Sequence, residues 1–126
     1  MRDFVKKLKF KDVASVVNFP ENFKDEFNTA NFAAFSEENS MNTNVLVFVR
    51  DKEEFLNFIK SKLVYVQYDA VLWFAYPKGN SKIKTDINRD ILWQFALDFE
   101  LRPVSAIAID TTWSALRFRP IACVGK

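Results

Sequence analysis

The stretch Asp69-Ala-Val-Leu-Trp-Phe-Ala-Tyr-Pro-Lys78 decides the expected fold. Between its first and last residues it is apolar almost throughout, which is typical of a strand covered on both faces, as in the centre of a parallel sheet. Pro77 has no N–H to donate to a neighbouring strand, so pairing is expected to stop there, and a polar loop opens at Lys78. The sequence therefore predicts a buried central strand that ends in a polar tip.

Other segments rich in β-branched and aromatic residues indicate further strands. The last of them alternates between apolar and polar residues, which is the period of a strand with one exposed face. A polar, acidic stretch without periodicity is expected to be a loop. The expected strands are 13–19, 32–36, 45–49, 104–109 and 113–120, and the expected loop is 37–44.

Three helices are expected between these strands. A short one follows Pro20, which suits a helix start. Asp51 with a glutamate three residues later is a capping pattern, and it opens an amphipathic helix of about three turns. Asp86 or Asn88 can cap a third helix at 89–100. This helix is apolar nearly all round, so it is expected either to be buried on two sides or to form a homodimer contact.

The order of these elements predicts an α/β fold, a three-layer Rossmann-like sheet that is mostly parallel, with an antiparallel C-terminal hairpin strand. The order resembles the C-terminal half of a Rossmann-like methyltransferase fold. The last strand is expected to close one edge of the sheet, where Arg117 and Arg119 would discourage association of edges. The 126 residues suit a single domain, 1–126.

The composition excludes several kinds of chemistry. The chain has no histidine, which removes Ser-His-Asp and Cys-His catalysis and imidazole metal ligation. Its two glycines cannot build a P-loop or a G-x-G-x-x-G dinucleotide loop. One cysteine cannot supply a structural zinc site. We therefore expect no metal and no cofactor.

The charge balance and the lone cysteine bear on partners and location. A net charge of +2 gives no basic footprint for nucleic acid, and the basic stretch 6–11 is expected to be a solvated face. The chain has neither a signal-peptide apolar region nor a run long enough to cross a bilayer. Cys123 rules out an internal disulfide and fits a reducing compartment. We expect a cytoplasmic protein with no membrane partner.

Three motifs resemble those of a known family: Tyr76-Pro-Lys78, Asn88-Arg-Asp90 and Trp113-Ser-Ala-Leu-Arg-Phe118. The family consists of small bacterial proteins and is catalogued as domain of unknown function 3052. The resemblance is specific over about residues 65 to 120 and weaker but collinear before them. It implies a compact bacterial domain, and it transfers no activity and no catalytic residue.

A ligand site is expected where the polar tips of two strands gather. Ligands of open α/β sheets bind beyond the carboxyl ends of parallel strands, and helix N-termini there offer free N–H donors. A purely structural role is the alternative for each residue. Lys78 would be a solvated loop lysine, Asp110 a turn residue and Trp113 a buried aromatic residue. The predicted ligand-binding residues are Tyr76, Lys78, Arg89, Asp110, Trp113 and Arg117.

Two functions remain open from the sequence. The favoured one is a non-catalytic binding or interaction domain that recognises an anionic small molecule or a protein partner. The alternative is an enzyme in which Lys78 acts as a base or Schiff-base nucleophile, with Asp110 and Tyr76 as proton partners.

Overall fold

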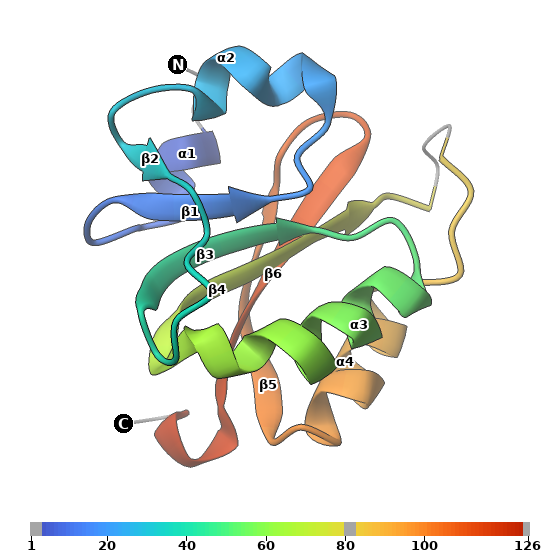
Figure 1. The fold of residues 1–126 in the computed structure, drawn as a ribbon. Coiled ribbons are helices and arrows are strands. Elements are labelled where there is room, and N and C mark those ends of the chain that lie inside the picture. Colours follow the sequence, from blue (N-terminus) through green and yellow to red (C-terminus); the bar gives the residue numbers. More distant parts are fainter. Residues whose placement is uncertain (1–3, 80–82, 125–126) are drawn as a thin grey trace.

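A six-stranded mixed sheet forms the centre of the molecule (Figure 1). The computed structural model describes residues 4–79 and 83–124. The strand order is β2-β1-β3-β4-β6-β5, in which β2, β1, β3 and β4 are parallel and β6 runs antiparallel to both of its neighbours. The strands are β1 (Ala14–Val17), β2 (Phe32–Ala33), β3 (Asn42–Phe48), β4 (Val66–Pro77), β5 (Leu101–Ala108) and β6 (Trp113–Pro120).

Helical segments precede, connect and follow these strands. They are α1 (Phe4–Lys7), η1 (Glu21–Phe23), α2 (Lys24–Phe27), α3 (Lys52–Lys62), η2 (Leu63–Tyr65), α4 (Arg89–Leu97) and η3 (Ile121–Cys123). The capping predictions hold, since Asp51 accepts from the Glu54 N–H and Asn88 accepts from the Ile91 N–H, each at 2.9 Å. Within 4–79 and 83–124, no helix has the length and apolarity needed to cross a bilayer.

The strand predicted to be central is central. Successive side chains of β4 point to opposite faces of the sheet, so it supplies two apolar clusters at once. Phe74 packs against Phe55 of α3 and against Phe118 of β6. On the other face, Trp73 lies with Phe48, and its indole N–H donates to the Leu8 carbonyl at 2.9 Å.

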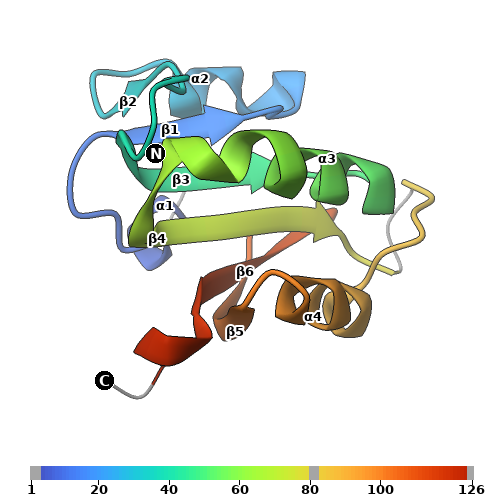
Figure 2. The ribbon, with the colours of Figure 1, turned by 60° about the horizontal axis from the view of Figure 1, so that its bottom comes forward.

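Helices contribute to both clusters. Side chains of α3 and α4 belong to the cluster around Phe74, whereas α1 and the η1–α2 segment belong to the cluster around Trp73. Figure 2 shows α3 and α4 from the side on which they lie. Within α4, Leu92 and Ala96 are fully buried, while Trp93 and Leu97 are exposed. The helix is therefore buried along one stripe and not on two sides.

The prediction that residues 113–120 close an edge of the sheet is wrong. β6 lies between β4 and β5, and β5 is the edge strand. The burial of Ala115, Leu116 and Phe118 explains this position, because a strand apolar toward both faces suits an interior place. β5 is largely exposed and carries Pro103, which is tolerated at an edge.

Several predicted boundaries also change, and the strand expected at 104–109 begins earlier, at Leu101. The loop expected at 37–44 ends earlier, because β3 begins at Asn42. The strand expected at 32–36 is reduced to Phe32–Ala33. The helix expected at 89–100 ends at Leu97, and a turn occupies the positions that follow.

We expect Phe74→Ala to lower the free energy of unfolding by about 3–5 kcal/mol, because the lost ring leaves a cavity among Phe55, Phe58 and Phe118. The ring centroids of these three residues lie 4.8, 5.6 and 5.6 Å from that of Phe74. Urea unfolding followed by far-UV circular dichroism measures the change. The control is Tyr68→Ala, whose side chain is 70% exposed, with an expected loss of about 0.5 kcal/mol or less. Equal losses in the two variants would contradict this account of the core.

Candidate binding groove

The carboxyl ends of β4 and β5, where the sequence predicted a site, do lie at the same end of the sheet. The Lys78 N–H donates to the Thr112 carbonyl at 2.8 Å, and the Asp110 carboxylate accepts from the Thr112 and Trp113 N–H groups at 2.8 Å each. However, β6 separates β4 from β5, so the tips do not border a crevice between neighbouring parallel strands. These hydrogen bonds close a turn around the end of β4.

Tyr76 and Arg89 lie on the same side of the sheet. Tyr76 is buried in the cluster that packs under α4, and its hydroxyl makes a hydrogen bond with Ser114. Burial raises the pKa of the Tyr76 phenol, and the nearby positive charge of Arg89 partly opposes this shift. Arg89 is the exposed first residue of α4.

Trp113 and Arg117 point to the opposite face. Trp113 is 2% exposed and packs edge-on against Phe48, with ring centroids 5.1 Å apart, so its indole offers little surface to a ligand. Arg117 pairs with Trp73 across β6 and β4. Its Nε is buried and has no hydrogen-bond partner among the described residues. The six predicted residues are therefore separated. Two lie on each face of the sheet, and Lys78 and Asp110 lie at the ends of the strands.

A hollow lies at the other end of β4, where the parallel strands begin. This groove has a volume of about 640 Å³, which is in the range of small-molecule sites. Its walls come from η2, from the first half of β4, from the turn that leads into β5, and from the end of β6 with η3. Its apolar lining includes Leu63, Val66, Leu72, Phe99, Leu101 and Phe118, and its polar lining is Ser40, Gln67, Tyr68, Asp69 and Glu100.

A bulge in β4 creates one wall of the groove. Thr43 of β3 stands opposite residues 67–70 of β4, so the extra residues of β4 leave the regular ladder. Asp69, within this bulge, accepts two hydrogen bonds from the Arg119 guanidinium, at 2.8 Å each. These bonds lower the pKa of the Asp69 carboxyl group below its usual value.

Left-handed backbone conformations gather around the groove. Ser40, Asp69 and Glu100 have φ values of 60°, 58° and 62°, and all three line it. Residues other than glycine adopt this region at a cost of about 1–2 kcal/mol, somewhat less for aspartate. Such strain is found preferentially at binding sites.

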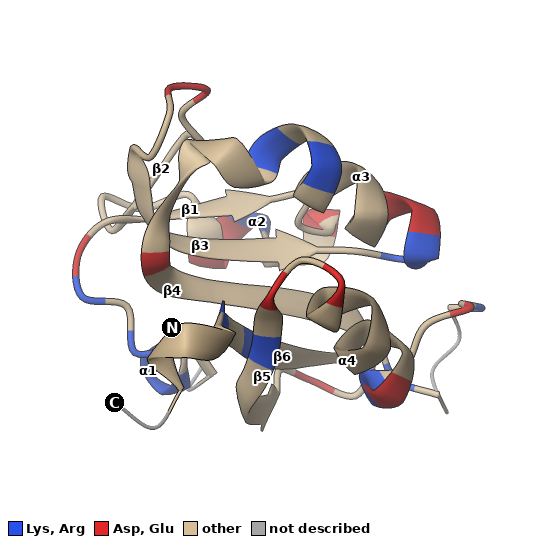
Figure 3. Cartoon of the chain, turned by 90° about the horizontal axis from the view of Figure 1, so that it is seen from below, with Lys and Arg blue, Asp and Glu red and all other residues tan. Residues whose placement is uncertain are grey.

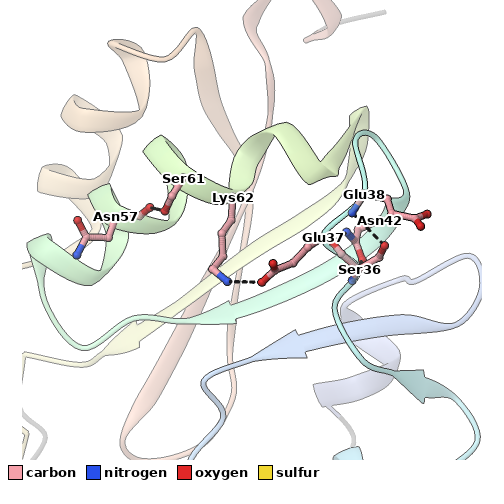
Figure 4. A network of polar contacts seen from close by, with 7 residues as sticks. All are labelled: Ser36, Glu37, Glu38, Asn42, Asn57, Ser61 and Lys62. Carbon is pink, nitrogen blue, oxygen red and sulfur yellow. Dashed lines mark hydrogen bonds and ion pairs between the residues drawn. The ribbon is translucent and has the colours of Figure 1, made fainter.

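A polar network holds the loop that carries Ser40 (Figure 4). The buried Asn42 side chain accepts from the Ser36 N–H at 3.0 Å, and its Nδ2 donates to the Ser36 carbonyl at 2.7 Å and the Tyr65 carbonyl at 2.8 Å. Lys62 of α3 reaches Glu37 at 3.4 Å. The Ser40 N–H itself donates to the Val64 carbonyl at 3.0 Å. The loop and η2 are thus fixed to each other beside the groove.

Two carboxylates, Asp69 and Glu100, lie at the groove, and that of Asp69 is paired with Arg119. Tyr68 is exposed, and its hydrogen bond with the Cys123 thiol raises the pKa of its phenol. The negative charges of Asp69 and Glu100 raise the same pKa further. Both carboxylates therefore lie close enough to the mouth of the groove to affect a group bound there.

No family model matches this chain, nor does any curated protein or solved structure. The resemblance carried by the Tyr76-Pro-Lys78 and Trp113–Phe118 motifs therefore stays a prediction. Among residues 4–79 and 83–124, no group of three or more His, Cys, Asp or Glu side chains could hold a metal ion. The groove is therefore the feature that bears on function.

The groove was missed by sequence reasoning, although two signals point to it. Gln67-Tyr68-Asp69 is a polar insertion in an otherwise apolar run, which is a signature of a bulge. Glu100 is the last residue of the expected helix, and a left-handed residue is common where a helix ends. The walls contributed by β6 and η3 depend on the strand order, which the sequence did not reveal.

We expect the ion pair of Asp69 and Arg119 to stabilise the protein only above the acid range. Because the pKa of Asp69 is lower in the folded chain than in the unfolded chain, its contribution is complete above about pH 5 and is lost as the pH falls through the folded pKa. The pair is partly exposed, so screening by solvent keeps its contribution small. Thermal unfolding between about pH 7 and pH 2 should show a shallower acid decline in Asp69→Asn than in the unmodified protein.

Arg119→Gln should flatten the acid decline in the same way, since it removes the other partner. Arg102→Gln is the matched control, because Arg102 is an exposed arginine opposite Arg119 on β5. Its pH profile should equal that of the unmodified chain. A profile in which Arg102→Gln behaves like Arg119→Gln would refute the assignment.

Glu100→Gly is expected to raise the free energy of unfolding by about 0.5–1 kcal/mol, because glycine adopts the left-handed conformation of this position without strain. Glu100→Ala removes the same carboxylate but keeps the Cβ, so it should give no such gain. Urea midpoints of the two variants, compared at neutral pH, separate strain from charge. A gain of equal size in both would attribute the effect to the carboxylate instead.

Proposed function

We propose that this protein is a non-catalytic binding domain whose groove accepts a mostly apolar small molecule that carries a cationic or hydrogen-bond-donating group. The observation that carries the proposal is an apolar hollow of about 640 Å³ with Asp69 and Glu100 at its rim. A large apolar pocket with a few convergent polar groups is the usual form of a small-molecule site.

The walls support a preformed site. The loop bearing Ser40 is tied to η2 by backbone and side-chain hydrogen bonds, and Asp69 is held by both guanidinium bonds of Arg119. A ligand that enters a groove of fixed shape avoids the entropy cost of ordering its walls. The apolar floor would contribute most of the affinity, and the carboxylates would decide the preferred charge of the ligand.

Three probes of equal chain length separate these contributions: hexylamine, hexanol and hexanoate. We expect hexylamine to bind most tightly, and hexanoate about tenfold more weakly, which corresponds to about 1.4 kcal/mol. Two-dimensional ¹H–¹⁵N NMR titrations would follow the backbone amides of Ala70, Leu72 and Leu101, which line the groove.

Ala122→Trp places a large side chain at the mouth of the groove, and it should weaken hexylamine binding at least about tenfold. Ala30→Trp is the matched control, at an exposed position outside the groove lining, and it should bind as the unmodified chain does. No saturable shifts with any probe would overturn the proposal. Equal binding of the amine and the carboxylate would retain the groove and remove the role of its acidic rim.

An anionic ligand at the opposite edge of the sheet is a second candidate. Tyr76 and Arg89 lie on the same side of the sheet, near the start of α4. Burial raises the pKa of the Tyr76 phenol and the positive charge of Arg89 partly lowers it, and this proximity supports the candidate. The enzyme alternative has less support. The Asp110 carboxylate accepts two backbone N–H groups of its own turn, which is a structural role.

Finer aspects of the sequence interpretation also remain proposals. A Rossmann-like three-layer class is supported by the parallel order β2-β1-β3-β4 and by apolar clusters on both faces of the sheet. A homodimer contact through residues 89–100 is supported by exposed Trp93 and Leu97, one turn apart on α4. The lone Cys123 supports a cytoplasmic location, and the motif resemblance alone supports a bacterial origin.

A further inference from the structure

A second hollow, lined by lysines, lies where α1 leads into β1. It has a volume of about 360 Å³, and its lining includes Lys6, Lys9, Lys11, Phe10, Asp12 and Phe32. Figure 3 shows the Lys and Arg positions of α1 and of the segment that follows it in blue. Three exposed lysines and one aspartate therefore line one small volume.

The lysine-bearing segment is anchored at both ends by buried groups. At one end the Trp73 indole N–H donates to the Leu8 carbonyl at 2.9 Å, and at the other the Lys11 N–H donates to Asn44 Oδ1 at 3.0 Å. Trp73 and Asn44 are 1% and 3% exposed. The lysines of residues 6–11 are exposed, as the sequence predicted, and hydrogen bonds tie the backbone between them to the core.

The backbone between the anchors is strained at a lysine. Lys9 has a φ of 55°, a conformation that glycine would adopt more easily. This residue lies between the two anchored residues, Leu8 and Lys11. Strained residues of this kind are typical of binding sites.

The charges of the hollow are not balanced from within. Asp12 Oδ1 accepts from the Val13 N–H at 2.8 Å, so one carboxylate oxygen is already engaged by the backbone. Lysine residues that line the same hollow repel one another, and an anion placed between them reduces that repulsion. Because the segment is already anchored, binding would order little additional backbone.

We propose that this hollow binds the phosphate group of a small molecule. Lysine ammonium groups are common ligands of phosphate, and the half-buried rings of Phe10 and Phe32 offer apolar surface to the remainder of the ligand. A net charge of +2 and a hollow lined by only three lysines favour a small molecule over a nucleic acid, which needs an extended basic surface. This site is separate from the groove beside Asp69.

Two-dimensional ¹H–¹⁵N NMR tests the proposal, with the Trp73 indole N–H and the Lys11 amide as local reporters. The probes are inorganic phosphate and a nucleoside monophosphate, and sodium chloride at equal ionic strength is the control for screening. We expect saturable shifts of both reporters with the two phosphates and not with chloride. The variant K9Q/K11Q should weaken binding at least about tenfold, which corresponds to 1.4 kcal/mol.

The matched control is K60Q/K84Q, which removes the same charge at two exposed lysines outside the hollow and should leave the affinity unchanged. Lys9→Gly is a second variant, because it removes one ammonium group without backbone strain and should also weaken binding. Equal shifts with chloride, or equal weakening in K60Q/K84Q, would overturn the proposal. Binding of a single-stranded oligonucleotide in the absence of any response to either phosphate would overturn it in favour of nucleic-acid recognition.

Discussion

The antiparallel pairing of β6 with β4 is the interaction on which the rest of the structure depends. Its register runs from Leu72 opposite Phe118 to Pro77 opposite Trp113. This pairing gives β4 a hydrogen-bonded neighbour on each side, so its apolar residues can fill both clusters. It also displaces β5 to the edge of the sheet and brings the end of β6, with η3, beside the start of β4.

The two ends of β4 consequently differ in what they can bind. At the carboxyl end, the turn between β5 and β6 is closed onto Lys78 by a backbone hydrogen bond, and Asp110 is engaged by its own turn. At the amino end, the bulge around Asp69 keeps the ladder open, and apolar side chains line the space that results. The rule that ligands bind beyond the carboxyl ends of parallel strands applies at a crevice between neighbouring parallel strands, and β6 occupies that place here.

Local features were predictable from the sequence, and non-local pairing was not. The run from Ala70 to Tyr76 indicates a strand covered on both faces, and Asp51 and Asn88 mark helix starts through bonds made within a few residues. The place of β6 depends on which strand completes the far side of β4, a matter of tertiary packing. Pro103 carries a usable signal, because a proline within a strand favours an edge position. The anchoring of Lys11 by Asn44, across 33 positions of the chain, leaves no trace in a local pattern.

The place of Cys123 has a practical consequence. It is the single cysteine of the chain, its thiol is free and partly accessible, and it interacts with Tyr68, which lines the groove. A maleimide dye would therefore couple at one defined point without any engineered mutation. Its emission would report directly on whether the neighbouring hollow is filled, so compound collections could be screened by fluorescence with the natural sequence.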